Sequence, residues 1–278
     1  MRTTIARWGV LAISALIAAP LLAALFNRLS LAGDGGPAST ILVSVYPAKA
    51  AFAVLLAYGV ALLLGCLGAT LSGPRAGLAA AAFTIMGPAW ASGTMIDLLR
   101  WADAPRSLYL LAAEGLVLGL LTFALAAVIS RLGKASERDS SDPLLSPASG
   151  LGILAAVIAC AAGVWLITQD TTKGQTIGGA VMGGLFAACA GRIASPRASA
   201  LAFILVVVAL GALAPIAGAV MHGGESLRAI YETKFVHMAL PLPLDWAAGA
   251  LLGVPLGLNV AGSLMERKQN GAGAPATP

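Results

Sequence analysis

The chain has 278 residues and a formal net charge of +5, with 59% hydrophobic and 10% charged residues. An average soluble domain carries roughly 25% charged residues, so a soluble fold of this length could not cover its surface with so few. A bilayer removes that requirement, because lipid-facing side chains are apolar. The 17 basic residues are scattered singly between apolar runs, which argues against a nucleic-acid partner. The composition therefore indicates an integral membrane protein whose main partner is the lipid bilayer.

A transmembrane helix needs about 20 mainly apolar residues. Runs of this kind predict an all-α membrane protein with eight transmembrane helices. The predicted spans are Trp8–Phe26, Ala50–Leu71, Gly77–Leu98, Ser107–Ser130, Leu151–Thr168, Thr176–Gly191, Ser199–Met221 and Pro243–Met265. The sixth is short, which leaves open whether it crosses completely. The first run also fits a signal peptide, with Arg2 and Arg7 before it and Ala18-Ala19 near its end.

Four matched elements, in the same order, predict an internal repeat. The first run aligns with the fifth, Gly9 falling on Gly152, which favours a retained span over a cleaved signal. Pro-Arg-Ala follows the second and the sixth runs, at Pro74 and at Pro196. The third and seventh runs contain Pro88 and Pro215, and the fourth and eighth share a glycine pattern. Because each copy has an even number of spans, the two copies are predicted to be parallel.

The repeat divides the chain into a first four-helix repeat (1–132), a linker (133–150), a second four-helix repeat (151–268) and a tail (269–278). The linker is polar and carries two prolines. The tail consists of small and polar residues, which predicts disorder. The main insertion in the first copy, Asn27–Pro47, is expected on the outer face.

Lysine and arginine bias sets the predicted orientation. One side collects ten basic residues and the other seven, out of the 17 in the chain. Five aromatic residues fall at the ends assigned to the outer side: Tyr46, Trp101, Tyr109, Trp165 and Trp246. The sequence therefore predicts both termini in the cytoplasm, most naturally at a bacterial inner (plasma) membrane.

Small residues recur every fourth position in three spans. These helix-packing residues are Ala57, Ala61, Gly65 and Ala69 in the second span, Gly179, Gly183, Ala187 and Gly191 in the sixth, and Gly249, Gly253 and Gly257 in the last. In lipid, close backbone approach drives helix association, so tight packing is expected, for example of the second span against the sixth. A pore or sliding seam is the alternative interpretation.

Matched prolines and one buried acid suggest a site between the repeats. Proline frees backbone polar groups inside the bilayer, and helix breaks at equivalent depth in two halves often mark a binding site. An ordinary kink is the alternative. Glu114 lies about 25 Å from Arg131 at helical rise, inside the hydrocarbon layer, where an acid is a functional candidate. The alternative for Glu114 is an interfacial position. The candidate substrate-binding residues are Glu114, Pro88, Ser92, Pro215 and Gly218.

The expected partners of Glu114 are Arg100, Arg106 or the opened backbone near Pro88. Asp245 is interpreted as interfacial, with Trp246 beside it as an anchor, and Asn259 as a contact between helices.

Segment 226–238 is predicted to be an amphipathic helix on the membrane surface. Its flanking His222 and His237 are interpreted as solvated rather than as metal or haem ligands. Cys66, Cys160 and Cys189 fall inside apolar runs and are expected to pack there, without a metal or a disulfide.

These patterns support three functions. The first is a small permease for an apolar, small or weakly acidic solute, with its site between the repeats. The second is a non-catalytic accessory or scaffold subunit that packs against a membrane protein partner or forms a homo-oligomer. An intramembrane enzyme is the least favoured, since catalytic signatures are absent from the sequence. No cofactor or metal is predicted.

Overall fold

The computed structural model describes residues 2–33, 35–101, 104–132 and 150–272, with the backbone alone described at 2–4, 101 and 267–272. Helices make up nearly all of this part of the chain, and its only extended pairing is a bridge between Leu31 and Pro37. The elements are α1 (Arg2–Ile13), the π-helical turn η1 (Ser14–Ala18), α2 (Ala19–Leu29), α3 (Pro47–Ser72), α4 (Pro74–Ala91), α5 (Met95–Trp101), α6 (Ala104–Leu132), α7 (Gly150–Ile167), α8 (Lys173–Ala194), α9 (Ala200–His222), η4 (Gly223–Glu225), α10 (Ser226–Tyr231), η5 (His237–Ala239) and α11 (Pro243–Ala272). The predicted all-helical class is confirmed.

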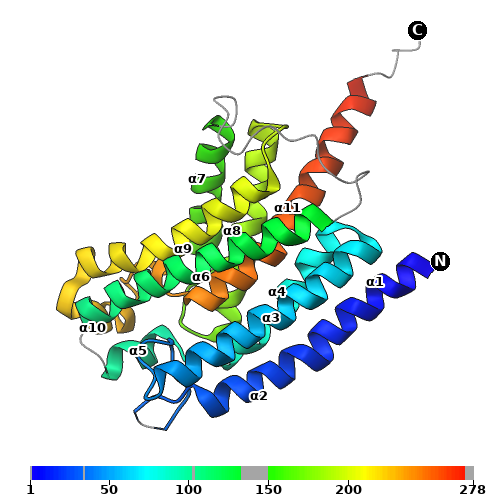
Figure 1. Ribbon diagram of the computed structural model, residues 1–278. Coiled ribbons are helices and arrows are strands. Elements are labelled where there is room, and N and C mark those ends of the chain that lie inside the picture. Colours follow the sequence, from blue (N-terminus) through cyan, green and yellow to red (C-terminus); the bar gives the residue numbers. More distant parts are fainter. Residues whose placement is uncertain (1, 34, 102–103, 133–149, 273–278) are drawn as a thin grey trace.

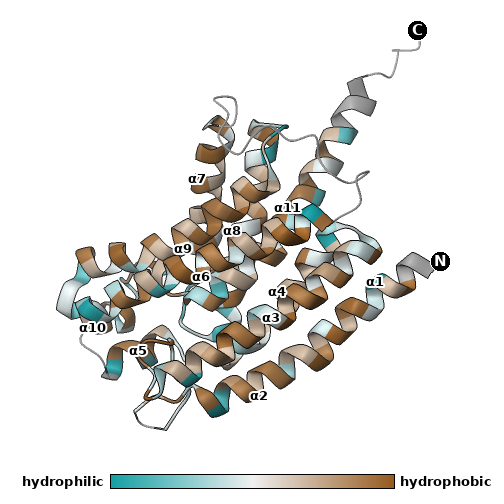
Figure 2. Ribbon diagram, viewed as in Figure 1, coloured by the Kyte–Doolittle hydropathy of each residue, from teal (hydrophilic) through white to brown (hydrophobic). Residues whose placement is uncertain are grey.

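Seven helical segments of the described chain are long and apolar enough to cross a membrane. They are Ile5–Leu29, Pro47–Ser72, Ala104–Leu132, Gly150–Ile167, Lys173–Ala194, Ala200–Tyr231 and Pro243–Glu266. Figure 2 shows apolar residues along most of their length and polar residues gathered toward the ends and connections. The protein is therefore a multi-pass membrane protein by helix length and composition.

The third predicted span is not among these seven. Where the sequence predicts a helix over Gly77–Leu98, α4 ends at Ala91 and α5 starts at Met95. The first helix ends because the backbone of Ser92 is extended. A new helix then begins, because the Asp97 carboxylate accepts hydrogen bonds from the Thr94 amide and hydroxyl, both at 2.7 Å, and so caps the start of α5. The prediction of eight apolar spans is thus not confirmed, while the short sixth span is longer than expected, as α8.

The first span contains a π-helical turn just before Pro20. Proline lacks a backbone donor, so the helix has to adjust near it, and π-bulges of this kind are typical of such places. The buried Ser14 hydroxyl donates to the Val10 carbonyl at 2.9 Å. Gly87 of α4 lies directly against the backbone of Ala19, where a Cβ atom would overlap it. The turn therefore lies where α2 and α4 pack without side chains between them.

The start of α1 and the end of α11 lie at the same end of the bundle, toward the right in Figure 1. Arg75, after the α3–α4 link, and Arg192, before the α8–α9 link, line one hollow at this end, so both links lie there as well. We call this end of the bundle the terminal end. The opposite end, with residues 30–46, α5, α10 and η5, is called the loop end. Arg192 donates to the Ala198 carbonyl, which places neighbouring Arg197 at the terminal end with Arg75, as a parallel repeat requires.

The last helix lies at the centre of the bundle, where α11 packs against α4, α6, α8 and α9. Between the predicted halves, α6 packs against α9 and α11 against α4, so the fourth span of each half contacts the third of the other. Within the halves the packing differs: α3 packs mainly on α4, whereas α8 packs mainly on α7 and α11. The repeat stays a prediction, with matched contacts between the halves and unmatched ones inside them.

The three small-residue stripes lie inside helix interfaces. Gly65 of α3 faces Ile129 and Ala81, and Gly183 of α8 faces Cys160 and Val164 of α7. The expectation that the second span packs on the sixth is wrong, because α3 and α8 share no interface in the described chain. The stripe of α11 packs on the backbone of α8. A Cβ atom at Gly184 of α8 would lie only 2.9 Å from the Gly249 carbonyl oxygen.

Trp246 does not belong to an aromatic belt. Its side chain is 2% exposed and stacks directly on Gly211 of α9, a glycine whose missing side chain makes room for the indole. Tyr46, Tyr109 and Trp165 are exposed, as predicted, and the side chain of Trp101 lies outside the described part. The interpretation of Trp246 as an interfacial anchor is therefore wrong.

Residues 226–238 do not form one surface helix. The helix α10 ends at Tyr231, and Thr233 has a φ of 56°. The amides of Lys234 and Phe235 both donate to the Ala229 carbonyl, which reverses the chain and packs Phe235 inside the protein. The apolar spacing predicts one continuous helix face, but the helix ends after six residues, ahead of Thr233 with its left-handed backbone.

Replacing Thr233 with glycine is expected to stabilise the protein by about 1 kcal/mol, because a β-branched residue is strained in the left-handed region. The side chain is exposed, so little packing is lost. Thermal unfolding in detergent should show Tm raised by about 3 °C. Glu225→Gly is the matched control, since exposed Glu225 has a φ of −91° and glycine there should lower Tm. A lower Tm for Thr233→Gly would contradict the prediction.

Two predicted connecting segments are only partly described. Of the linker 133–150, residues 133–149 lie outside the described residues, as do residues 273–278 of the tail. The helix α11 continues to Ala272, so disorder from residue 269 is wrong for the first four residues. Glu266, Arg267, Lys268 and Gln269 are good helix formers, which carries α11 past its apolar part.

Candidate functional site

Glu114 is buried in the first half of α6, with 6% of its surface exposed. Its Oε2 atom accepts a hydrogen bond from the Leu42 amide at 3.2 Å. The Ile41 amide and the Thr40 hydroxyl also hydrogen-bond this carboxyl group. Glu114 is therefore held by segment 40–42 and is not a solvated interfacial acid.

The expected partners of Glu114 are wrong. Both Nε and Nη2 of Arg100 donate to the Tyr231 hydroxyl, at 3.2 and 3.0 Å, which ties α5 to α10 at the loop end. Arg106 is exposed at the start of α6. The actual partners of Glu114 belong to the insertion Asn27–Pro47, which folds inward over α6. The sequence contains no signal for this inward fold.

The segment 30–46 is fixed over Glu114 by its own backbone and by the end of α4. Phe26 O accepts from Ser30 N, and the Ala38 carbonyl accepts from Gly93 N at 3.2 Å. The Ser39 hydroxyl donates to the Thr94 carbonyl at 2.9 Å. Ser39, Thr40 and Ser44 are all buried, so this polar stretch of chain closes the loop end as part of the packed structure.

A second buried polar group lies at the seam between the predicted halves. Lys173 Nζ, at the start of α8, donates to Ser92 Oγ of α4 at 2.8 Å and forms an ion pair with Asp245 Oδ1 of α11 at 3.2 Å. The Lys173 side chain is 12% exposed and that of Asp245 is not exposed at all. Asp245 Oδ2 also accepts from the Leu242 amide at 2.9 Å. Asp245 is therefore a fully buried acid, paired with Lys173 of α8 near the start of α11.

Glu114 and Ser92 face the same narrow gap. The gap is lined by Phe26, Ser39, Thr40, Ile41, Ser92, Glu114, Leu242, Pro243 and Leu244, and it is too narrow to hold a water molecule. Asp97 lies close enough to add its negative charge to the field at Lys173. We call Glu114, Ser92, Lys173, Asp245 and Asp97 the polar cluster; it is closed in this structure.

The structure brings together only part of the predicted site. Ser92 and Glu114 line the gap, and Pro88 lies one turn before Ser92 in α4. Gly218 instead lies against the ring of Phe235, and neither it nor Pro215 lines the gap. Both α4 and α9 continue through their prolines, so neither helix is broken there.

Sequence reasoning missed Lys173 as a candidate. It directly precedes a span, and Asp245 stands near the start of another span at the same predicted end of the bundle. Lys173 and Asp245 carry opposite charges at the same end of the second predicted repeat, and this pattern is a signal from which their ion pair could be predicted. The contact to Ser92, however, joins residues 81 positions apart and carries no local signal.

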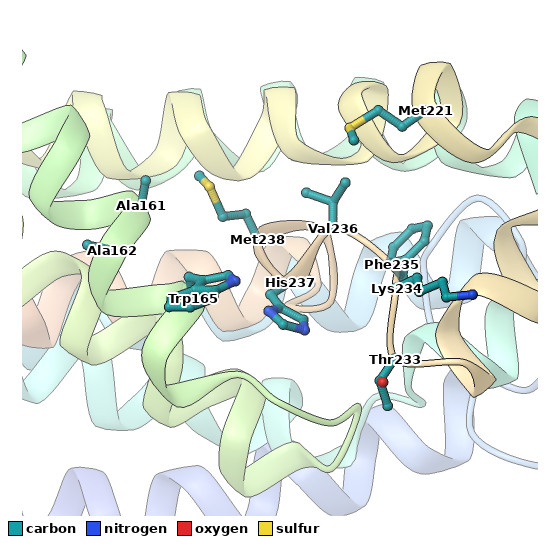
Figure 3. A pocket seen from close by; sticks show the side chains of 10 residues that line it. All are labelled: Ala161, Ala162, Trp165, Met221, Thr233, Lys234, Phe235, Val236, His237 and Met238. Carbon is teal, nitrogen blue, oxygen red and sulfur yellow. The ribbon is translucent and has the colours of Figure 1, made fainter.

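His237 lines an open groove of about 570 Å³ at the loop end, shown in Figure 3, and His222 packs against Phe235, another residue of its wall. The rings of His237 and Trp165 are 6.1 Å apart, and those of His222 and Phe235 are 5.3 Å apart. His222 Nε2 and His237 Nδ1 are buried without a hydrogen-bond partner, so full solvation of these rings is wrong. In the described chain, no three metal-binding side chains gather. Cys66, Cys160 and Cys189 are free thiols.

At the terminal end, Asn259 acts as a contact between helices, as the sequence suggested. Its Oδ1 atom accepts from Arg75 Nη1 at 2.7 Å, which joins α11 to the start of α4. This hydrogen bond crosses the seam between the predicted halves, as the Lys173–Ser92 contact does at the loop end. The seam is therefore held by polar contacts at both of its ends.

Fold and site together define a multi-pass helical membrane protein with a closed, buried polar cluster near one end of the bundle. Comparison with protein-family models, with curated proteins and with solved structures found no match.

Proposed function

We propose that this protein is a small permease, whose site is the polar cluster at the seam of two four-helix halves. The structure then corresponds to a closed state, with both termini in the cytoplasm of a bacterium. The observation that carries the proposal is that Glu114 and Ser92 line one gap at that seam, while Ser92 also accepts from Lys173, which is paired with the buried Asp245. Ionisable groups buried in a membrane protein are costly and are by default functional candidates.

The chemistry of the cluster favours a small, neutral or weakly acidic solute. Lys173 and the amides of segment 40–42 can donate to an acceptor group, and Glu114 can accept from a hydroxyl or an acid proton. The other linings of the gap are largely apolar, so a multiply charged solute would stay poorly paired. Entry requires that segment 30–46 moves and that the Lys173–Ser92 contact opens.

Glu114→Gln is expected to reduce solute uptake into proteoliposomes at least tenfold while the protein stays folded. Glutamine keeps the size and still accepts from the Leu42 amide, but it neither carries the charge nor exchanges a proton. Uptake would be screened in wild-type protein with radiolabelled small neutral solutes and monocarboxylates, after selecting those that raise Tm by binding. Glu225→Gln, at an exposed carboxylate that neither lines the gap nor lies at the terminal end, is the matched control and should retain uptake.

An accessory subunit is the second candidate, and the filled interior favours it. The gap at Glu114 is too narrow for a water molecule. The small-residue stripes, in contrast, lie in internal interfaces and are not free to pack on a partner, which speaks against the subunit. Purification in mild detergent separates the two functions. A stoichiometric protein partner, together with wild-type protein that no solute stabilises, would contradict the permease and support the subunit.

A further inference from the structure

A polar hollow of about 370 Å³ lies at the terminal end, opposite the polar cluster. It is lined by Arg75, Arg192, Leu258, Asn259, Gly262, Ser263, Met265 and Glu266. Arg75 comes from the start of α4, Arg192 from the end of α8, and the remaining residues from α11. The hollow is thus built from both predicted halves.

Among the described residues, two guanidinium groups and the carboxylate of Glu266 line this hollow. Like charges that face the same concave surface repel each other, and a bound anion relieves that repulsion. Arg75 is oriented by its 2.7 Å hydrogen bond to Asn259, and Arg192 by its 2.9 Å hydrogen bond to the Ala198 carbonyl. Oriented guanidinium groups match the geometry of phosphate oxygens, to which they donate paired hydrogen bonds.

The depth of the hollow suits a phosphate group at the membrane surface. Asn259 and Glu266 are seven residues apart on α11, about 10 Å along the helix axis, so the hollow extends from the end of the apolar span into the span itself. The Ser263 side chain, one turn from Asn259, adds a neutral hydroxyl. Basic pockets between transmembrane helices commonly bind the phosphates of lipid headgroups.

We propose that the Arg75–Arg192 hollow binds a phosphate group, presented by an anionic lipid headgroup or by a small soluble phosphate. The bound group bridges α4 of the first half and α8 of the second. It therefore holds the halves together at the terminal end. The proposal of a phosphate site does not rest on the permease function and applies equally if the protein is an accessory subunit.

The test uses the full-length protein in neutral detergent, with Tm followed by tryptophan fluorescence. One arm adds phosphatidylglycerol against phosphatidylcholine, and the other adds sodium phosphate against sodium chloride at equal ionic strength. At least one anion is expected to raise the Tm of the wild type. A response to lipid alone assigns a headgroup site, whereas a response to inorganic phosphate assigns a site for soluble phosphates; either supports the proposal.

Arg75→Gln and Arg192→Gln should each weaken the apparent affinity about tenfold, because each removes a charge-assisted contact. Arg197→Gln is the matched control: Arg197 is exposed at the same end but does not line the hollow. Equal anion responses in all three single variants, or no response in the wild type, would overturn the proposal.

Discussion

Gly253→Ala is expected to destabilise the protein by about 3 kcal/mol, because the new methyl group would have no room between α8 and α11. A Cβ atom at this position would overlap the Val181 carbonyl oxygen and lie 2.8 Å from the Leu185 amide nitrogen. Both are backbone atoms, which cannot move aside as a side chain can. The two helices would have to separate along the largest interface of the bundle.

The effect should appear as a lower Tm and as earlier unfolding in sodium dodecyl sulfate. Gly262→Ala is the matched control on the same helix, because a Cβ atom at Gly262 meets nothing within 4 Å. Since alanine also favours helix more than glycine does, this control should be neutral or slightly stabilising. Equal stability of the two variants would show that the close approach of α8 and α11 is wrong.

Lys173→Met is expected to destabilise the protein by about 3 to 5 kcal/mol, because it leaves the Asp245 carboxylate buried without its cation. Asp245 is completely buried and keeps its acceptor contact with the Leu242 amide, so its charge cannot reach water. Trp246 follows Asp245 directly and is buried. Its fluorescence therefore reports unfolding at this position.

The double variant Lys173→Met/Asp245→Asn tests the cause of this loss. Asparagine removes the charge but still accepts from the Leu242 amide, so most of the lost stability should return. Lys234→Met is the control, since the Lys234–Glu232 pair is exposed and should leave Tm unchanged. If the double variant were less stable than Lys173→Met, the buried ion pair would not be the cause.

Polar contacts join the predicted halves at both the loop end and the terminal end. At the loop end, segment 30–46 covers Glu114, and the Ser92–Lys173 hydrogen bond closes the seam. At the terminal end, the seam holds the Arg75–Asn259 hydrogen bond beside an open hollow. A permease that alternates between two states would open the loop end while the terminal end stays closed. Because a phosphate bound to Arg75 and Arg192 would bridge α4 and α8, its binding should favour the states in which the terminal end is closed.

The amino-acid sequence by itself determined the class of protein, because the length of an apolar run is a local property that the bilayer selects directly. It placed most spans within a few residues, and it identified Glu114 as a buried acid and Asn259 as a contact between helices. It misplaced the end of α4 and the character of 226–238, where single residues, Ser92 and Thr233, end helices that the apolar pattern would continue.

Only the tertiary structure decided which groups meet. Leu42, which donates to Glu114, lies 72 positions earlier in the chain, and Lys173 and Asp245 are also 72 positions apart. Such pairs depend on how the helices pack, which here follows from glycine contacts between α8 and α11 and from the inward fold of segment 30–46. Hydrophobic periodicity shows that a helix lies in lipid, but it does not record which neighbour it faces, since lipid and protein interiors are equally apolar.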